Sequence, residues 1–356
     1  MIRSVITGTG SYIPEIAVKN EAFISNAFFE KDGSKVYKSN KIVIEKFREI
    51  TGISERRYAK SDQTASHLAC ISAEHAIADA AVDRERIDYI IVAHNFGDVV
   101  KDSNRVNVVP SLASRVKALL KIKNPDCVAY DLAFGCPGWV EGIIQANYFI
   151  KSGDAKCCLV IGAETLSRVI DPHDRDSMIY SDGGGAVVLE AAETRDCGII
   201  AHKSQTHAVE HVDLLQMSGS YSPYTNEKTD LFLKMNGRKV YEFALSNVPL
   251  VIKDALDKAS VALKDIRKVL IHQANDKMDT AILERLFRLY GSSEIPEGIM
   301  PMIIGWLGNS SVATVPTLLD LILKGNLPGQ KLSKGDKVVM ASVGAGMNIN
   351  AVVYQF

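Results

Sequence analysis

The sequence predicts an α/β protein in which two similar halves pack as one body. Amphipathic helices alternate with wholly apolar strands, a pattern typical of buried, largely parallel sheets. Segments 73–96 and 251–275 also share one order of elements: a helix, a short turn that carries a valine, and a strand rich in isoleucine and valine. Segments 153–164 and 335–346 form a second pair, each with a turn, an apolar strand and then glycine. Both pairs indicate a unit that occurs twice in the chain.

The repeat places a division near residue 195. We therefore expect an N-terminal half over 1–194 and a C-terminal half over 195–356, without a low-complexity linker between them. The region from about 21 to 60 departs from the repeat, since it is charged and helical, and we interpret it as a cap-like insertion. The polar stretch 216–230 is loop-like. Both segments are candidates for the border of a substrate entrance, because long irregular segments are often functional.

Composition argues against several classes of protein. The chain has 356 residues, a net charge of −1, 47% hydrophobic and 23% charged residues. This balance gives no reason to expect nucleic acid or an anionic membrane as a partner. No apolar run approaches the roughly 18 residues of a membrane span. The N-terminal MIRSVITGTGSYIPE has the pattern of a strand and turn, not of a signal peptide, so we expect a cytoplasmic protein. The six cysteines show neither a disulfide framework nor zinc-ligand spacing.

Cys136 is the first candidate for catalysis. It lies in DLAFGCPGWVEG, between a strand-like run and a helical pattern, with Gly135 and Gly138 close by. The glycines clear the space that a substrate and backbone donors need near sulfur. A cysteine at a helix N-terminus also has its thiolate favoured by the helix dipole and by free amide groups. The sequence therefore predicts a nucleophilic thiol at this corner.

His272 and Asn309 are two further candidates at the ends of apolar segments, where sites form in α/β proteins. His272 follows the strand-like IRKVLI, and Asn309 lies in WLGNSSVATVP, before an amphipathic helix. A thiolate can accept an acyl group from a thioester. Neutral histidine and asparagine can then donate hydrogen bonds to the enolate oxygen that forms when a malonyl group loses CO2. Each residue alone is weak evidence, but together they predict acyl transfer coupled to decarboxylation.

Nearly end to end, the chain resembles the type III β-ketoacyl-acyl carrier protein synthases of the thiolase-fold superfamily. The segments that carry the resemblance are GTGSYIPE, TGISERRYA, YDLAFGCPGWVEG, GAETLSR, DPHDRDSMIYSDGGGAVVLEA, HQAN, GNSSVATVP and SVGAGMNINAVVYQF. The resemblance implies a thiolase fold with a layered α-β-α-β-α body. It implies a homodimer that condenses an acyl starter with malonyl-acyl carrier protein in the initiation of fatty acid synthesis. The substrates would be thioesters of coenzyme A and of acyl carrier protein, with no metal or organic redox cofactor.

The resemblance also implies roles for individual residues. The catalytic triad would be Cys136, His272 and Asn309, and the backbone amides of Cys136 and Ala345 would form an oxyanion hole. Substrate contacts would come from Arg175, Tyr180, Phe134, Val109, Asn275 and Lys277. Arg175 would hold the coenzyme A nucleotide, and Val109 would close the far end of the acyl pocket of the partner subunit. Arg238, Lys239 and Lys277 are candidates for docking the acidic carrier protein.

The sequence departs from the family pattern around these positions. Pro137 follows the nucleophile in place of a small residue, and Phe134 replaces the usual alanine. Tyr180 replaces phenylalanine, while Ile50 and Lys277 replace arginines. We expect intact condensation chemistry with altered contacts to the thioester carrier. The alternative is therefore a specialised type III-like ketosynthase or acyltransferase of secondary lipid or polyketide biosynthesis.

Related classes of enzyme differ at defined positions. A thiolase would need a second catalytic cysteine near the C-terminal glycine turn, but no cysteine follows Cys197. Elongating ketosynthases use two histidines, whereas the third triad position here is Asn309. The Cys–His–Asn set is shared with chalcone synthase-like enzymes, and the short loops and HQAN favour the type III class. A non-catalytic scaffold is a further alternative, because a fold alone does not decide function.

Two motifs suggest other chemistry. HAVEH at 207–211 matches the H-x-x-E-H zinc signature, but zinc would need a helix with both histidines on one face and a third ligand. GTGSY and DGGGA lack the G-x-G-x-x-G pattern of a dinucleotide site. We interpret their glycines as positions for tight turns and close helix–sheet packing.

Overall fold

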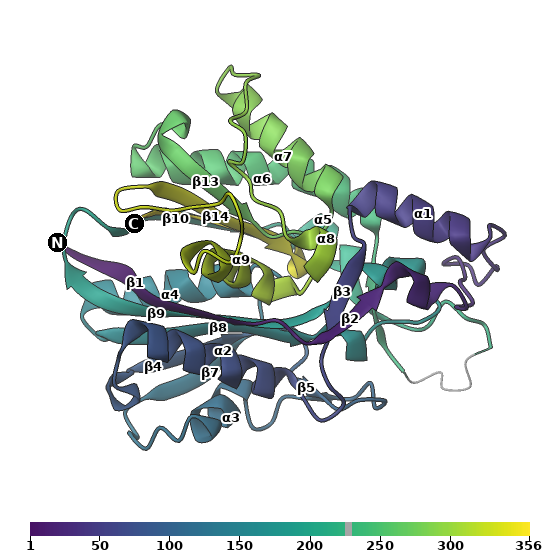
Figure 1. Ribbon diagram of the computed structural model, residues 1–356, viewed down its shortest axis with the longest axis horizontal. Coiled ribbons are helices and arrows are strands. Elements are labelled where there is room, and N and C mark those ends of the chain that lie inside the picture. Colours follow the sequence, from purple (N-terminus) through teal and green to yellow (C-terminus); the bar gives the residue numbers. More distant parts are fainter. Residues whose placement is uncertain (225–229) are drawn as a thin grey trace.

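The structure is a computed structural model that describes residues 1–224 and 230–356. Its larger sheet has five strands in the order β1-β9-β8-β4-β7 (Figure 1). Their bounds are Ile2–Tyr12 for β1, Asp182–Glu193 for β9, Cys157–Thr165 for β8, Tyr89–Ala93 for β4 and Val128–Leu132 for β7. β4 runs parallel to β7 and β8, whereas β9 is antiparallel to β8 and β1.

The second sheet has four strands in the order β10-β15-β14-β13. Their bounds are Gly198–Thr206 for β10, Asn348–Gln355 for β15, Lys337–Gly344 for β14 and Ile266–Ile271 for β13. The strands of the predicted repeats, β4 with β8 and β13 with β14, form parallel neighbours in both sheets. The two sheets therefore share one strand order, apart from the additional edge strand β7.

The prediction of largely parallel sheets is wrong, because both sheets are mixed. β15 is antiparallel to both of its neighbours, as β9 is in the first sheet. Only the three residues Ala345–Met347 separate β14 from β15. A parallel return needs a crossover of a dozen or more residues, so this connection forces a hairpin. Continuous apolar runs report burial on both faces of a sheet and not the direction of the neighbouring strand.

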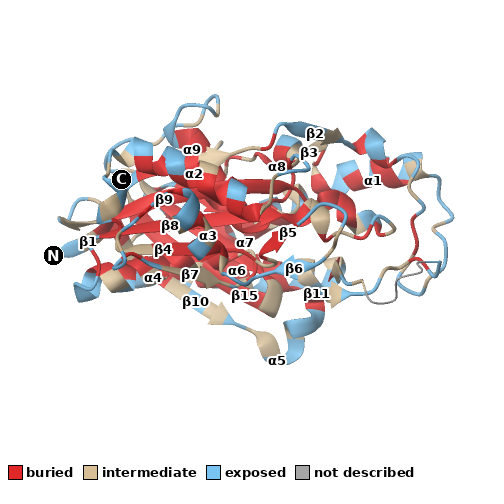
Figure 2. Ribbon diagram, turned by 90° about the horizontal axis from the view of Figure 1, so that it is seen from below, coloured by how far each residue is buried: buried red, intermediate tan, exposed pale blue. Residues whose placement is uncertain are grey.

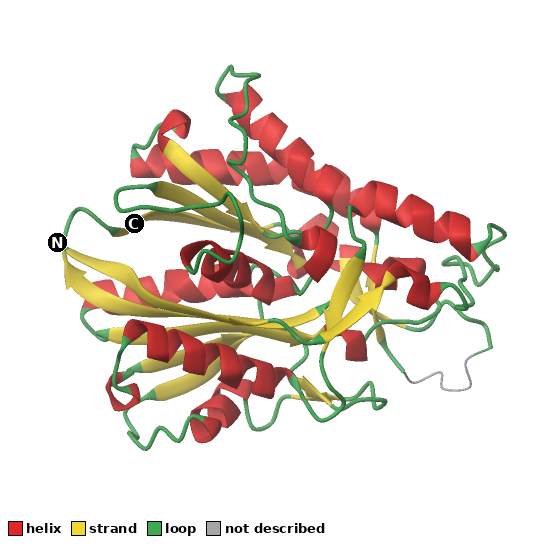
Figure 3. Cartoon of the chain, viewed as in Figure 1, coloured by secondary structure: helices red, strands yellow, loops and turns green. Residues whose placement is uncertain are grey.

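Helices and sheets alternate in five layers (Figures 1 and 3). Two helices cover the outer face of the larger sheet, two lie between the sheets, and two cover the outer face of the smaller sheet. In that order they are α2 Ala65–Ala80 and α3 Leu112–Leu119, α4 Gly138–Ser152 and α9 Thr314–Leu323, and α6 Gly237–Ala259 and α7 Asp276–Leu289. This arrangement is the layered α-β-α-β-α body that was predicted.

Buried residues fill the two sheets and the layer between them (Figure 2). Nine of the ten residues of α9 are buried, from Thr314 to Ile322. α9 packs against β1 and β9 on one side and β13 and β14 on the other, so it is buried all round and not on one face as an amphipathic helix would be. Its carboxylate, Asp320, accepts hydrogen bonds from Thr9 and Ser11. Close contact between the two halves follows from this shared central layer.

The region 21–60 consists of α1 (Asn40–Thr51) and irregular chain. Near its two ends, β2 (Ile16–Lys19) pairs with β3 (Glu55–Tyr58). α1 is amphipathic and lies against α7 (Figure 1). The other short elements are β5 Asp98–Val99, β6 Val106–Asn107, α5 Ala208–His211, β11 Leu215–Ser218, β12 Phe232–Met235 and α8 Ile304–Leu307. Part of the predicted loop 216–230, residues 225–229, lies outside the described residues. No helix in the described ranges combines the length and apolar character that a membrane span requires.

Candidate active site

Cys136 lies in the turn that joins β7 to α4, as predicted. Gly135 has a φ of +68°, a left-handed conformation that glycine adopts without steric cost. A Cβ atom on Gly135 would lie 2.7 Å from the backbone nitrogen of Ala345, and one on Gly344 would lie 2.6 Å from the backbone nitrogen of Cys136. The two glycines therefore let the turns around Cys136 and Ala345 touch through their backbones.

Two asparagines of β15 hold these turns together. The Asn348 side chain donates to the carbonyl oxygens of Ala345 at 2.9 Å and Phe134 at 3.4 Å. The Asn350 side chain donates to the Pro137 carbonyl at 3.0 Å and is itself fully buried. Sequence reasoning missed both residues, because their partners are more than 200 positions away except for Ala345.

The Cys136 thiol is protonated in the substrate-free protein. Burial raises its pKa to about 11, a hydrogen bond from Ser311 opposes this shift, and the charge of Glu164 adds to it. The expectation that the N-terminus of α4 favours the thiolate is therefore not met at rest. The loss of hydration outweighs the helix dipole, so Cys136 must lose its proton as it attacks.

His272 follows β13 directly, and its backbone N–H donates to the Ala341 carbonyl on β14 at 2.9 Å. Burial lowers the pKa of the imidazole to about 4, and an interaction with the Ser311 backbone opposes part of the shift. The ring is therefore neutral near pH 7, as predicted. Its Nδ1 atom has no hydrogen-bond partner in the described part of the chain, so the ring keeps hydrogen-bonding capacity for a substrate.

Asn309 is held by the segment that contains Tyr180. Its backbone nitrogen donates to the Ile179 carbonyl at 3.0 Å, and its carbonyl accepts from the Ser181 nitrogen at 2.8 Å. The side-chain Oδ1 accepts from the Ser311 backbone nitrogen at 2.8 Å, which leaves the amide NH2 group to face a substrate. Tyr180 is 5% exposed, and burial, with a smaller contribution from Cys136, raises the pKa of its hydroxyl.

Ser311 connects the three predicted catalytic residues. Its hydroxyl donates to Cys136 Sγ at 3.2 Å, its backbone nitrogen donates to Asn309 Oδ1, and its backbone interacts with His272. Ser311 has a φ of +53°, which is uncommon for a residue with a side chain and occurs mainly at constrained or functional positions. The structure thus brings Cys136, His272 and Asn309 to one place, through a serine that sequence reasoning missed.

A cavity of about 570 Å³ leads from the surface to Asn309. Its wall is mainly apolar and comes from α1, α6, the first turn of α7 and the chain around 175–179. The cap-like region therefore borders the entrance. Ile50, at a position where the family has arginine, lies in this wall and is 41% exposed. Four cations, Lys38, Lys46, Arg175 and Arg238, lie among the lining residues.

The predicted substrate-binding residues lie at different places relative to this cavity. Asn275 lines it and caps α7, since its side chain accepts from the Met278 nitrogen at 3.1 Å. Arg175 also lines it, but both of its terminal nitrogens donate to the Glu30 carboxylate, at 2.9 and 3.2 Å. Phe134 is half-buried in the nucleophile turn.

Four predicted substrate residues, Phe134, Tyr180, Lys277 and Val109, are not among the described residues that line the cavity. Lys277 lies exposed in the first turn of α7. Val109 is 82% exposed and precedes the cis peptide bond to Pro110. Both positions suit contacts with a second molecule better than contacts with a substrate held by this chain alone.

The other motifs have structural roles. In HAVEH, α5 contains only the four residues Ala208–His211, and the rings of His207 and His211 both pack on Phe243. The described residues contain no group of three or more side chains suited to hold a metal. A Cβ atom at Gly10 in GTGSY or at Gly184 in DGGGA would lie within 2.6 Å of the α2 backbone. These glycines permit close helix–sheet packing, as predicted.

Comparison with known proteins places the chain in a family. The sequence pattern of the 3-oxoacyl-[acyl-carrier-protein (ACP)] synthase III family matches residues 130–208, and that of its C-terminal part matches 256–356. The β-ketoacyl-[acyl-carrier-protein] synthase III of Erythrobacter litoralis (strain HTCC2594) is 33% identical over 100% of both chains.

Similar solved structures support the same family and fold. The 3-oxoacyl-[acyl-carrier-protein] synthase III of Aquifex aeolicus VF5 has 29% identity and a TM-score of 0.79, with 99% of this chain and 100% of the other covered. The priming β-ketosynthase of the R1128 polyketide pathway, at 24% identity and a TM-score of 0.80, covers 99% of this chain and 96% of its own, and shows a shared fold alone. The predicted thiolase fold is confirmed, and the chain belongs to the β-ketoacyl-[acyl-carrier-protein] synthase III family of condensing acyltransferases.

Proposed function

We propose that the protein condenses an acyl starter thioester with malonyl-acyl carrier protein to give a β-ketoacyl product in the initiation of fatty acid synthesis. Family membership supports the reaction class. The observation that carries the assignment to these residues is the position of Ser311, which contacts Cys136 and Asn309 by hydrogen bonds and interacts with His272.

The first half-reaction loads the starter onto Cys136. Sγ attacks the thioester carbonyl, the bond from that carbon to the carrier sulfur breaks, and the thiol proton leaves with the released carrier thiol. Backbone amides of Cys136 and Ala345 are proposed to bind the oxyanion of the tetrahedral intermediate. Contact between their two turns supports this role, because the amides belong to neighbouring backbone segments.

The second half-reaction uses His272 and Asn309. The malonyl group loses CO2, and hydrogen bonds from the neutral imidazole and from the Asn309 amide stabilise the enolate oxygen that develops. The carbanion attacks the acyl carbon, the bond to Sγ breaks, and the released Cys136 thiolate takes up a proton from solvent. The low pKa of His272 supports a role as a neutral donor, because an imidazolium would not persist at neutral pH.

The proposal includes a homodimer in the cytoplasm, without metal or redox cofactor. Val100, Val106, Val108 and Val109 are 60, 47, 47 and 82% exposed. Exposed apolar side chains gathered on one loop support an interface between protein chains. In a dimer, this loop would bring Val109 to the acyl pocket of the second subunit. Acyl carrier protein and acyl-coenzyme A are the proposed partners, and the half-exposed pair of Arg175 with Glu30 makes coenzyme A the less favoured source of the starter.

Mass spectrometry of Cys136 after exposure to a panel of acyl thioesters tests this function. We expect the mass of the Cys136 peptide to increase by the acyl group, and malonyl-acyl carrier protein to convert this species into a β-ketoacyl product. Cys136→Ala should abolish both steps. A Cys136→Ala protein that condenses at the wild-type rate would disprove the mechanism.

A further inference from the structure

A chain of hydrogen-bonded polar groups, buried or half-buried, extends from Cys136. The Ser311 hydroxyl donates to Cys136 Sγ at 3.2 Å and accepts from Asn95 Nδ2 at 3.0 Å. Asn95 Nδ2 also donates to Glu164 Oε1, and the Asn95 backbone nitrogen donates to the same oxygen at 2.8 Å. Glu164 is 1% exposed and Ser311 is 3% exposed, whereas Asn95 and Cys136 are half-buried.

The direction of each bond follows from chemistry. Burial raises the pKa of Glu164 to about 7, but its Oε1 atom already accepts from the Asn95 backbone nitrogen. Above that pH the carboxylate is ionised and only accepts, so the side of the Asn95 amide that faces Glu164 must be nitrogen. That nitrogen has two hydrogens and directs the second one to Ser311 Oγ. The serine oxygen therefore acts as an acceptor toward Asn95, and its single hydrogen remains for the sulfur. A reversed Asn95 amide would present oxygen to Ser311 and draw this hydrogen away from Cys136.

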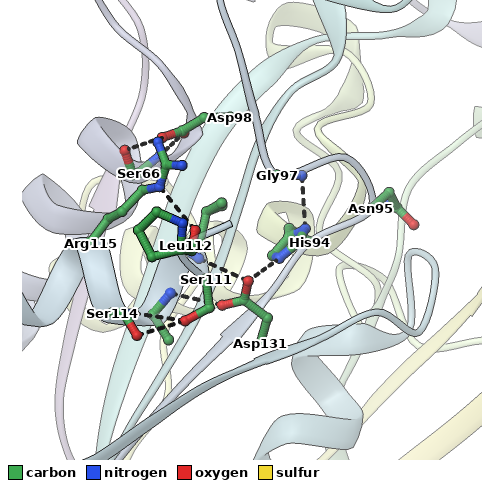
Figure 4. Close-up of polar contacts among 12 residues, drawn as sticks. Ser66, His94, Asn95, Gly97, Asp98, Ser111, Leu112, Ser114, Arg115 and Asp131 are labelled. Carbon is green, nitrogen blue, oxygen red and sulfur yellow. Dashed lines mark hydrogen bonds and ion pairs between the residues drawn. The ribbon is translucent and has the colours of Figure 1, made fainter. Parts of the chain in front are cut away.

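The backbone around Asn95 is itself fixed. Asn95 and His94 follow β4, and Figure 4 shows His94 directed toward Asp131 and Gly97. The Gly97 nitrogen donates to His94 Nδ1 at 2.9 Å, which places the ring proton on Nε2, 2.9 Å from Asp131 Oδ2. Asp131 also accepts from the first backbone nitrogens of α3. Asn95 thus projects from a turn that is held on its other side.

We infer that Ser311 is an additional catalytic residue, whose hydroxyl donates a hydrogen bond to the Cys136 thiolate and keeps its proton, and that Asn95 and Glu164 are positioning residues that aim this hydrogen bond at sulfur. The inference deepens the proposed function, since it takes Cys136 as the nucleophile. Thiolate character develops twice in each turnover: when Cys136 attacks the starter, and when it leaves the acyl group during condensation. A donor on sulfur stabilises both states.

The same geometry explains how a half-buried cysteine of raised pKa can react. Burial alone disfavours the thiolate, and Glu164 disfavours it further by its charge, so a donor that faces sulfur has to offset both effects. The other ionisable group that interacts with this sulfur is the Tyr180 hydroxyl, while His272 is neutral. The charge of Glu164 opposes the thiolate, so Glu164 can assist catalysis only through the orientation of Asn95.

The rate of Cys136 alkylation by iodoacetamide, measured between pH 7.5 and 9.5 by mass spectrometry of the Cys136 peptide, tests the inference without any substrate. In this range the rate follows the thiolate fraction. In Ser311→Ala, the line of log rate against pH should move toward higher pH by about one unit, because the thiolate loses a hydrogen bond from a donor. At a fixed pH this shift corresponds to a roughly tenfold loss of alkylation rate. Ser310→Ala is the matched control: the neighbouring hydroxyl contacts Thr314, and we expect no shift.

Asn95→Ala tests the positioning residues. It should produce the same shift as Ser311→Ala, and the double variant should show no additional shift, because Asn95 acts through Ser311. Asn95→Ala leaves Glu164 buried without its partner, so Asn95→Ala with Glu164→Gln serves as the second variant if the single one does not fold. An unshifted line for Ser311→Ala overturns the catalytic role, and additive shifts overturn the positioning role. Failure of the wild-type protein to load an acyl group would overturn the proposed function. The alkylation rates would still decide whether Ser311 acts on the Cys136 thiolate.

Discussion

Gly344 and Cys136 touch through their backbones, since a Cβ atom on Gly344 would lie 2.6 Å from the Cys136 nitrogen and 2.8 Å from its Cβ. No side chain fits between them. The nucleophile turn in one half of the chain is thus positioned by the β14–β15 hairpin of the other half, and the geometry of catalysis depends on how closely the halves approach.

Gly344→Ala should therefore damage both stability and loading. The added methyl group must displace the Cys136 turn, and overpacking of this kind costs about 1–3 kcal/mol. We expect a lower midpoint of thermal unfolding and slower acylation of Cys136, followed by mass spectrometry. Gly219→Ala is the control, because a Cβ atom there meets no atom within 4 Å and should change neither property. If Gly344→Ala is acylated at the wild-type rate, the backbone contact between Gly344 and Cys136 is not needed for loading.

His272→Ala and Asn309→Ala should separate the two half-reactions. Both residues are proposed to act on the enolate, so each variant should lose about 10²–10³-fold in condensation, as expected for removal of one donor, while acylation of Cys136 persists. Acyl-enzyme formation and CO2 release, measured separately, check this division. Equal losses in both steps would mean that these side chains serve the nucleophile instead.

Val109→Phe should shift the preference for starters toward short chains. In the proposed dimer, Val109 closes the acyl pocket of the second subunit, and a ring fills space that the isopropyl group leaves open. Each CH2 group that the pocket accommodates contributes about 0.8 kcal/mol on burial. We expect the wild type to load chains longer or bulkier than acetyl. Competition between acetyl and octanoyl thioesters measures the preference. The assignment would be refuted if the wild type loads acetyl faster than octanoyl and Val109→Phe has the same preference as the wild type.

Arg238→Glu should weaken docking of the carrier protein. Arg238 lies at the cavity wall and is exposed, so a reversed charge would repel an acidic partner. We expect a higher KM for carrier-bound substrate, an unchanged KM for a small thioester analogue, and a smaller difference at high salt. Lys264→Glu, on an exposed lysine outside the cavity lining, controls for net charge. Equal effects of both variants would argue against a docking site at Arg238.

Acid should destabilise the protein in part through His272. The pKa of His272 is about 4 in the folded chain and 6.5 ordinarily, so the unfolded chain binds one more proton between these pH values. Stability is therefore complete above pH 6.5 and falls as pH decreases toward 4, by about 3 kcal/mol. His272→Gln should reduce the difference in unfolding free energy between pH 7 and pH 4.5, measured with urea. An unaltered difference would show that His272 is not buried in its neutral form. His202 has a similarly lowered pKa, so part of the acid sensitivity should remain.

The sequence alone was enough to predict a site residue where that residue directly follows a strand in the chain. Cys136 follows β7 and His272 follows β13, so the end of an apolar run was enough to indicate both. The antiparallel course of β9 and β15 was not predicted, because apolar runs carry no information on strand direction.

Ser311, Asn95 and Glu164 were missed for a different reason. Their contacts depend on the approach of the segment around Val312 to β8, where a Cβ atom on Gly162 would lie 2.4 Å from the Val312 carbonyl oxygen. Such a contact joins positions far apart in the chain. The sequence did contain one signal: HNF follows β4 as HQAN follows β13, so the repeat could have indicated a polar cluster at both strand ends.

The shared strand order of the two sheets has a consequence for how this molecule evolves. β4 and β13 occupy equivalent places, and each is followed by a histidine, His94 and His272. One histidine lies beside the proposed nucleophile and the other fixes a supporting turn. If the halves descend from a duplicated ancestor, one copy of this position has kept its chemistry while the other has become scaffolding. Exchanging sequence between the two strand ends should then disable the enzyme.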